Sequence, residues 1–265
     1  MGKFRRPRAS RARFDRRDHD MRIVVKVGTS TLAHPTGRLN IQRMEKLCKV
    51  LSDLKNMGHE IILVSSGAIA MGFGKLNLSE RPKDVPTKQA SAAVGQCELM
   101  YIYDKLFTEY NHTVAQLLIT APDIEEGGVR KQNFHNTLAR LLELGALPVI
   151  NENDTISVTE LMFTDNDELS GLIASMMNAQ ALIILSNIDG IYNGSPSDPD
   201  SLVIREIGQG KDLSNYIQTS KSSFGRGGML TKTNIARKVA DEGITVIIAN
   251  GKRDNILINL IEHPE

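Results

Sequence analysis

Short apolar runs alternate with longer amphipathic stretches along most of the chain. The apolar runs cover residues 23–25, 61–64, 147–150, 181–185 and 245–249, and a further strand is expected over residues 114–119, where Gln116 interrupts the apolar residues. Runs of this length are typical of strands that are buried on both faces, as strands of parallel sheets are. Because helical stretches separate these runs, the pattern predicts an α/β fold, a three-layer αβα sandwich around a mostly parallel central sheet.

The amphipathic stretches repeat with the period of a helix. The first begins near Leu39 and ends at Gly58, and its apolar stripe consists of Ile41, Met44, Leu47, Cys48, Leu51 and Leu54. Further helices are expected over residues 88–110, 133–144 and 169–178, after Ala68, and up to Ala240. Loops are expected over residues 75–87, 121–130 and 193–201, and a short edge strand over residues 256–261.

Small residues are concentrated early in the expected helix 88–110. They are Ala90, Ala92, Ala93 and Gly95. Small side chains let helix backbones approach closely, so we expect this helix to pack against another one, with a subunit interface as one candidate.

Two of the expected strands run directly into turns that suit a phosphate group. Lys26 lies in the first strand, and Gly28-Thr29-Ser30 follows with two hydroxyl groups and free backbone N–H groups. A cation and backbone amides at a strand end can bind phosphate oxygens. Ser65-Ser66-Gly67-Ala68 forms a second junction of this kind. Each junction alone also fits a purely structural turn, with Lys26 pointing to solvent.

Polar and acidic residues cluster after two later segments. Asn151-Glu152-Asn153-Asp154-Thr155 closes the strand 147–150, and Asp165-Asn166-Asp167 opens the helix that follows. Asn and Asp favour turns and helix N-caps, which explains one or two members of each cluster. The others offer hydrogen-bonding groups for a small polar substrate, especially an amine, because ligands of open α/β sheets bind at the carboxyl ends of strands. Asp167 is a candidate for orienting lysine ammonium groups at a phosphate.

A glycine-rich segment precedes the last helix. Residues 222–232 read SSFGRGGMLTK, and their glycines with Arg226 and Lys232 suit the phosphates of a nucleotide. The segment matches neither the Walker A pattern nor the dinucleotide-binding glycine pattern, and its glycines alone also fit a flexible loop. Phosphate-type junctions in both halves predict an acceptor lobe over about residues 21–166 and a nucleotide lobe over about residues 167–265.

The composition argues against several classes of protein. A formal net charge of +1 is not that of a generally basic nucleic-acid binder. Cys48 and Cys97 lie far apart without metal-type spacing, which favours a reducing, cytoplasmic compartment, and the six histidines form no ligand set. No apolar run reaches the length of a membrane span.

Residues 1–20 differ from the rest of the chain. They contain eight Lys and Arg residues and three Asp residues, a net charge of +5. They lack the apolar region of a secretory signal. We expect a disordered basic leader, or a start assigned too early because Met21 directly precedes the first strand. Contact with nucleic acid and an organelle presequence are weaker alternatives.

Five motifs resemble, in this order, those of the glutamate 5-kinases in the amino acid kinase family. They are VVKVGTS, VSSGAIAMG, VINENDT, TDNDELS and GRGGMLTK, within about residues 21–260. The first two are shared by amino acid kinases in general, whereas NEND with DND and the glycine loop are more specific. The resemblance implies ATP-dependent phosphorylation of the γ-carboxylate of L-glutamate to L-glutamyl 5-phosphate, the first step of proline biosynthesis. It also implies Mg²⁺, a homo-oligomer and feedback inhibition by proline, with neither nucleic acid nor membrane as a partner.

The resemblance implies roles for single residues. Lys26 and Lys232 would neutralise charge on the transferred phosphoryl group, with Asp167 organising both. The Gly28 and Gly67 amides would line the phosphoryl path. Glutamate would be bound by Ser66, Asp154 and Asn166, with Asp154 near its ammonium group. ATP would be bound by Lys26, Gly28, Ser186, Asn187, Arg226, Gly227, Gly228, Met229, Leu230, Thr231 and Lys232. No side chain is expected to ligate a metal, and the γ-carboxylate needs no general base because it is ionised at neutral pH.

Two segments depart from the pattern of the family. Many relatives have Thr-Asp where this chain has Ser186-Asn187, and Arg226 replaces a smaller residue in the glycine loop. The chain also stops at residue 265, so the C-terminal PUA domain of many relatives is expected to be absent.

Two other functions share part of this pattern. An amino acid kinase acting on UMP, carbamate, aspartate or N-acetylglutamate would have the same lysines and glycines, but the NEND and DND clusters argue against it. A non-catalytic protein that senses glutamate or proline would accommodate Asn187, but Lys26, Asp167 and Lys232 argue against it.

Overall fold

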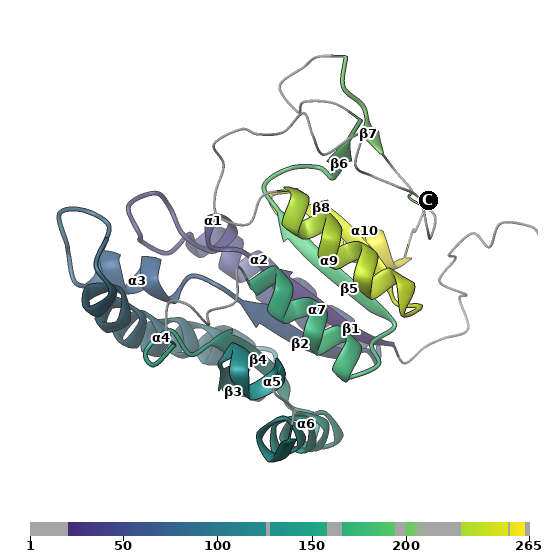
Figure 1. Cartoon of the computed structure of the whole chain (residues 1–265), viewed down its shortest axis with the longest axis horizontal. Helices are drawn as coiled ribbons and strands as arrows, with labels where there is room; N and C mark the ends of the chain where they lie inside the picture. Colours follow the sequence, from purple (N-terminus) through teal and green to yellow (C-terminus); the bar gives the residue numbers. More distant parts are fainter. Residues whose placement is uncertain are drawn as a thin grey trace, which may run out of the picture.

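A six-stranded sheet forms the centre of the computed structural model (Figure 1). The structure describes residues 21–125, 128–157, 166–193, 200–204, 207, 229–253 and 255–262. The strands have the order β3-β4-β2-β1-β5-β8, and every neighbouring pair is parallel. They are β1 (Arg22–Val27), β2 (Glu60–Ser65), β3 (Val114–Ile119), β4 (Leu147–Glu152), β5 (Ala181–Ser186) and β8 (Thr245–Asn250). The predicted parallel sheet is confirmed.

Helices cover both faces of this sheet. One face packs against α2 (Ile41–Asn56), α4 (Val85–Thr108) and α10 (Ile256–Glu262). The other packs against α5 (Ala121–Glu125), α6 (Gly128–Glu143), α7 (Asn166–Met176) and α9 (Met229–Asp241), of which α7 and α9 lie side by side in Figure 1. The remaining elements are α1 (Thr29–Leu32), α3 (Ala68–Lys75) and a small antiparallel sheet of β6 (Ile191–Tyr192) and β7 (Val203–Ile204). The three-layer αβα sandwich is therefore confirmed.

The alternation of side chains along β1 decides where Lys26 lies. Ile23, Val25 and Val27 belong to the core on the side of α2 and α4. Val24 belongs to the core on the side of α7 and α9. Because successive residues of a strand point to opposite faces, Lys26 shares the face of Val24 and points toward α7 and α9.

The sheet is continuous across the division expected near residue 166. β1 pairs with β2 on one side and with β5 on the other. The carboxyl ends of strands from both halves of the chain therefore meet at one edge, which is where ligands of such sheets bind. The assignment of an acceptor lobe and a nucleotide lobe stays a prediction.

Three expectations about secondary structure are wrong. Residues 128–130, expected in a loop, form the start of α6. Residues 121–125, expected in a loop, form α5, because the Asp123 carboxylate accepts hydrogen bonds from the backbone N–H and hydroxyl of Thr120 at 3.0 and 2.5 Å. Residues 256–261, expected as an edge strand, belong to α10. There Leu257 and Ile261 are buried, and their spacing of four residues is that of a helix face.

The helix α4 begins earlier than predicted. It begins at Val85, because the Asp84 carboxylate accepts a hydrogen bond from the Thr87 N–H at 2.9 Å, and Pro86 occupies the first turn. In the stripe predicted for α2, Ile41 is an exception, since it is 63% exposed. None of the helices in the described part of the chain has the length and apolar character needed to cross a membrane.

The small residues of α4 pack against α3 of the same chain. A Cβ atom on Gly95 would lie 1.7 Å from the Ala68 carbonyl oxygen, and one on Gly72 would lie 1.7 Å from that of Ser91. The two backbones are therefore in direct contact, as the small residues predicted. The packing partner of Gly95 is an element of this chain, whereas Ala90 and Ala93 are exposed, and a subunit interface at this helix stays a prediction.

Candidate active site

Three charged side chains from distant parts of the sequence meet at the sheet edge. Lys26 comes from β1, Asp167 from the first turn of α7 and Lys232 from the first turn of α9. The Lys26 Nζ lies 2.6 Å from Asp167 Oδ1, and the Lys232 Nζ lies 2.6 Å from Asp167 Oδ2. Their side chains are 4%, 0% and 13% exposed, respectively. The structure thus brings together the three residues that the sequence singled out for phosphoryl transfer.

The electrostatics of Asp167 are set by its two partners. Burial alone would raise the pKa of this carboxyl group, but the ammonium groups of Lys26 and Lys232 outweigh burial and hold the pKa below its ordinary value. The first turn of a helix also favours negative charge. Asp167 is therefore ionised at neutral pH and keeps both ammonium groups in fixed positions.

Close packing of α7 and α9 places Lys232 within reach of Asp167. A Cβ atom on Gly171 would lie 2.7 Å from the Ile235 Cγ2 and 3.2 Å from the Val239 Cγ2. Only a glycine leaves room for these two side chains of α9. Lys232 lies one helical turn before Ile235, on the same side of α9, and so faces the start of α7.

Two glycines lie at the starts of helices, where backbone N–H groups commonly bind anions. Gly28 precedes α1, and a Cβ atom on it would lie 3.7 Å from the Lys26 Nζ. Gly67 precedes α3 with a φ of 109°, a conformation that favours glycine. Both lie at the carboxyl edge of the sheet, immediately after β1 and near the end of β2.

A chain of amide side chains forms the other side of the site. Asn166 Nδ2 donates to Asn151 Oδ1 at 2.8 Å, to Ser66 Oγ at 2.9 Å and to the Ser65 carbonyl oxygen at 3.1 Å. Asn151 Nδ2 in turn donates to Gln96 Oε1 at 2.9 Å. Because Asn166 Nδ2 is fully used by the protein, its Oδ1 is the atom left to accept a hydrogen bond from a substrate.

A cavity of only about 10 Å³ adjoins this row of amide side chains. It is lined by Ala68, Ala92, Gln96, Leu118, Glu152, Asn153, Asp154 and Thr155. Burial raises the pKa of Asp154 from 3.8 to about 6. Asp154 is still ionised at neutral pH and gives the cavity a carboxylate that suits an ammonium group.

The comparisons with known proteins agree with this geometry. The sequence pattern of the family described as "Amino acid kinase family" matches residues 21–250. The chain belongs to the amino acid kinase family.

Two curated relatives of this amino acid kinase are glutamate 5-kinases. A glutamate 5-kinase from Bacteroides thetaiotaomicron is 61% identical over 246 residues, which are 92% of this chain and 68% of that protein. A glutamate 5-kinase from Clostridium perfringens is 47% identical over 246 residues, 91% of each chain. A crystal structure of an isopentenyl phosphate kinase from T. acidophilum has a TM-score of 0.63 at 16% identity, covering 92% of this chain and 97% of that one, and shows the shared fold.

The structure describes some of the residues that were predicted to bind the nucleotide. Ser186 ends β5, and because Val27 pairs with Leu185, Ser186 lies beside Gly28 at the same sheet edge. The Ser186 Oγ lies 3.4 Å from the Asn187 Oδ1. Met229, Leu230 and Thr231 form the start of α9. Asp165, Arg226, Gly227 and Gly228 lie outside the described residues.

Sequence reasoning missed Gln96 and gave Asn151 no role of its own. Gln96 lies in the middle of α4, outside every motif, and nothing in its sequence neighbourhood marks it. Asn151 was expected to follow the strand at residues 147–150, but it continues β4 and is buried. The signal that was available for Asn151 is its place in the NEND cluster.

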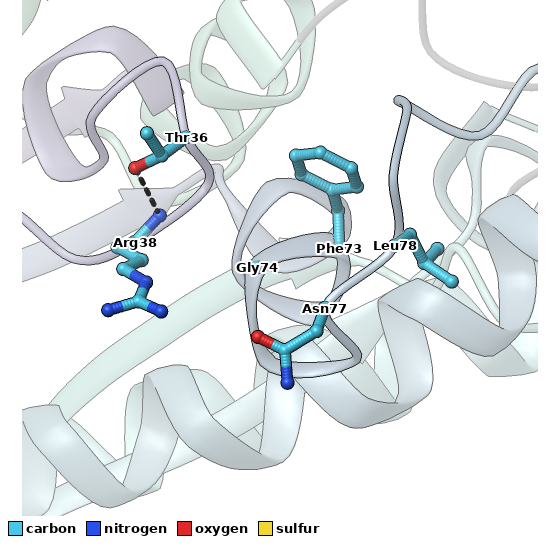
Figure 2. A pocket seen from close by; sticks show the side chains of 6 residues that line it. All are labelled: Thr36, Arg38, Phe73, Gly74, Asn77 and Leu78. Atoms are coloured by element: carbon cyan, nitrogen blue, oxygen red, sulfur yellow. Dashed lines mark hydrogen bonds between the residues drawn. The ribbon is translucent and has the colours of Figure 1, made fainter.

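A second hollow of about 490 Å³ lies away from these residues (Figure 2). Figure 2 shows Thr36 and Arg38 on one side of it and Phe73, Asn77 and Leu78 on the other. The hollow is open, and it shares no residue with the Lys26–Asp167–Lys232 group or with the cavity at Asp154. It offers one cation and two uncharged polar side chains, which match no particular ligand.

Proposed function

We propose that this amino acid kinase is a glutamate 5-kinase, which transfers the γ-phosphoryl group of ATP to the γ-carboxylate of L-glutamate. The Lys26–Asp167–Lys232 group beside a cavity with an ionised carboxylate is the observation that carries the proposal. A carboxylate oxygen of glutamate forms a bond to the γ-phosphorus while the bond from that phosphorus to the β–γ bridging oxygen breaks. The products are L-glutamyl 5-phosphate and ADP.

The two lysines act on the group that is transferred. Charge spreads over the equatorial oxygens of the phosphoryl group in the transition state, and ammonium groups held beside them stabilise it. Asp167 keeps both ammonium groups oriented before the substrates arrive, so that little reorganisation is needed during the reaction. No general base is required, since the attacking carboxylate is already ionised.

The acceptor side distinguishes an amino acid from other acceptors. Asp154 offers its carboxylate to the α-ammonium group of glutamate, and Asn166 offers its Oδ1 atom. Ser66 lies 2.9 Å from Asn166, between this cavity and the glycine turn at Gly67. These groups support a small zwitterion as acceptor better than a nucleotide.

We place the nucleotide at the carboxyl ends of β1 and β5 and at the start of α9. Gly28, Ser186 and Lys232 lie there, and the segment 226–231 with Asn187 would complete the ATP site. Lys26 serves the nucleotide as well as the acceptor. This assigns about residues 167–265 to the nucleotide and about residues 21–166 to glutamate.

Mg²⁺ is expected to accompany ATP. Among the described residues no group of three His, Cys, Asp or Glu side chains could hold a metal ion, and both oxygens of Asp167 contact ammonium groups. These residues do not fit a protein cage for Mg²⁺. The ion would instead reach the site on the phosphate oxygens of ATP, as it commonly does in kinases.

Proline inhibition, self-association and a cytoplasmic location also belong to the proposal. Proline shares a cationic amine and an α-carboxylate with glutamate, so a cavity that recognises these two groups suits either molecule. Cys48 and Cys97 are both free, as is usual for proteins of a reducing compartment.

The experiment that tests the function compares phosphoryl acceptors. The purified protein is incubated with ATP, Mg²⁺ and hydroxylamine, and glutamate, aspartate, N-acetylglutamate, carbamate and UMP are supplied one at a time. We expect ADP and a γ-hydroxamate with glutamate and little ADP with the others. Absence of glutamate-dependent ADP release would contradict the proposal, and release with UMP or aspartate would assign another acceptor.

A further inference from the structure

Gln96 places an unused hydrogen-bond donor in the acceptor cavity. Its side chain lines the cavity together with Asp154, and the residue is only 7% exposed. Its Nε2 atom is buried and has no hydrogen-bond partner among the described residues. Buried polar atoms of native proteins are nearly always paired, so an unpaired one that lines a cavity of about 10 Å³ points to a missing partner the size of a water molecule or of one small group of a ligand.

The hydrogen bonds around Gln96 fix which end of its amide faces the cavity. The Glu152 backbone N–H donates to Asn151 Oδ1 at 2.9 Å, and a backbone N–H can only donate. The other end of the Asn151 amide must therefore be the Nδ2 donor, which lies 2.9 Å from Gln96. Gln96 must accept this bond with Oε1, and so its Nε2 is the free end.

The other end of this row of amide side chains, at Asn166, gives an independent check of the direction of its hydrogen bonds. Asn166 Nδ2 lies 3.1 Å from the Ser65 carbonyl oxygen, which can only accept. Asn166 must therefore present Nδ2, and Asn151 accepts from it with Oδ1 at 2.8 Å. A backbone donor and a backbone acceptor thus impose the same direction on all three amides.

A donor in this cavity requires an acceptor on the substrate. Glutamate has acceptor oxygens only on its two carboxylates. Under the proposed function the γ-carboxylate must lie at Lys26 to receive the phosphoryl group, and this leaves the α-carboxylate. Glu152 and Asp154 also line the cavity and would repel an incoming carboxylate, so a donor is needed where the α-carboxylate binds.

We propose that Gln96 binds the α-carboxylate of the amino acid acceptor through Nε2, while Asp154 binds the α-ammonium group. This rests on the proposed function and names the residue that recognises the part of the substrate that does not react. Gln96 is a specificity residue in this account. It selects an α-amino acid over an amine or a dicarboxylate that carries only one of the two groups.

The test replaces the Nε2 atom of Gln96. Gln96→Glu keeps the oxygen that accepts from Asn151 and exchanges the Nε2 donor for an oxygen, whereas Gln96→Met removes both polar ends. Gln116→Glu makes the same chemical change at an exposed glutamine on β3 and is the matched control. Three acceptors are compared: L-glutamate, 4-aminobutyrate, which lacks the α-carboxylate, and glutarate, which lacks the ammonium group.

We expect Gln96→Glu to lower kcat/KM for glutamate by about 10- to 100-fold, mostly through KM, because a hydrogen bond to a charged group is lost. The value for 4-aminobutyrate should change by less than about threefold, since that molecule has no carboxylate at this position. Glutarate should lose as much as glutamate. Gln116→Glu should leave all three unchanged, and dissociation constants from calorimetry should follow the same order.

Two results would overturn the assignment of Gln96. One is an unchanged kcat/KM for glutamate in Gln96→Glu, and the other is an equal loss for all three acceptors, which would make Gln96 a support for Asn151 only. If the unaltered protein binds glutamate without phosphorylating it, the proposed function fails, and calorimetry on the variants still decides the role of Gln96. If it binds no glutamate, both proposals fail.

Discussion

At the scale of single residues, Asp167 explains how the two ammonium groups of the site are held in place. Asp167 contacts one ammonium group with each oxygen, at 2.6 Å in both cases. The side chains of Lys26, Asp167 and Lys232 are largely buried. Ammonium groups that are fixed in this way are oriented in advance toward the negative oxygens of a phosphoryl group.

Asp154 leads to a prediction about pH. Because burial raises its pKa to about 6, Asp154 becomes neutral as the pH falls through this value. Neither charged group that glutamate offers to the site titrates between about pH 5 and 8. We therefore expect KM for glutamate to rise by up to about tenfold for each pH unit below the pKa of Asp154, with kcat little changed. Initial rates between pH 5 and 8 measure this.

The variant Asp154→Asn separates binding from stability. A carboxyl group whose pKa is raised on folding favours the folded state below its ordinary pKa of 3.8, and this contribution is lost as the pH rises through about 6. At neutral pH the variant should therefore be more stable, by at most about 3 kcal/mol, although it binds glutamate poorly. A lower melting temperature with unchanged KM would contradict this role of Asp154.

The sequence predicted the charged members of the site better than its uncharged members. Lys26, Asp167 and Lys232 stand out because a cation in a strand, or an acid at a helix start, is unusual enough to require a reason. Gln96 does not stand out, since a glutamine within a helix is ordinary. Its importance comes from the direction of hydrogen bonds that run through Asn151 to Asn166, and this direction depends on contacts between β4, α4 and α7.

At the scale of elements, the site depends on how closely α9 approaches α7. β1 presents Lys26 to the face that these helices cover, and Asp167 in the first turn of α7 contacts its ammonium group. Lys232 reaches the same carboxylate because Gly171 lets the Ile235 side chain of α9 lie against the α7 backbone. A change at Gly171 should therefore act on catalysis through the position of α9.

We expect Gly171→Ala to lower kcat. Its new Cβ atom would lie 2.7 Å from the Ile235 Cγ2, so α9 must shift and Lys232 moves relative to Asp167. A displacement of this kind can reduce kcat by about 10- to 100-fold, whereas KM for glutamate should change little, because Gln96 and Asp154 lie on other elements. Ile235→Ala in the same chain should restore part of kcat. Full activity of Gly171→Ala alone would show that α9 need not be close to α7.

The pattern of apolar residues within a segment predicted helix or strand correctly where the pattern fitted only one of the two. The strands at residues 61–64 and 181–185 were placed correctly, because each is a short apolar run that follows a stretch of helical periodicity in the alternating pattern of the chain. Residues 256–261 were assigned wrongly because a short apolar run fits a strand and a helix equally well, and packing against the α2 side of the sheet decides the outcome. Ile41 followed the α2 stripe but is exposed as the first residue of the helix.

At the scale of the whole molecule, one parallel sheet collects residues from both halves of the chain. β1 and β2 supply Lys26 and the Gly67 turn, β4 supplies the acceptor cavity, and β5 supplies Ser186. The alternation of strands and helices predicted this arrangement because the handedness of parallel crossovers leaves few alternatives. The separation into an acceptor lobe and a nucleotide lobe does not follow from the sheet, which is continuous at the division.

The central claim is that a carboxylate oxygen of glutamate attacks the γ-phosphorus of ATP beside Lys26 and Lys232. Glutamate labelled with ¹⁸O in its γ-carboxylate tests it most directly, with hydroxylamine added to release the phosphate and phosphorus NMR to detect the label. If the account is right, each released phosphate carries one ¹⁸O, and Lys232→Met lowers the yield by about 100-fold or more while exposed Lys238→Met does not. Phosphate without ¹⁸O, released at the same rate, would mean that water is the acceptor and would contradict the account.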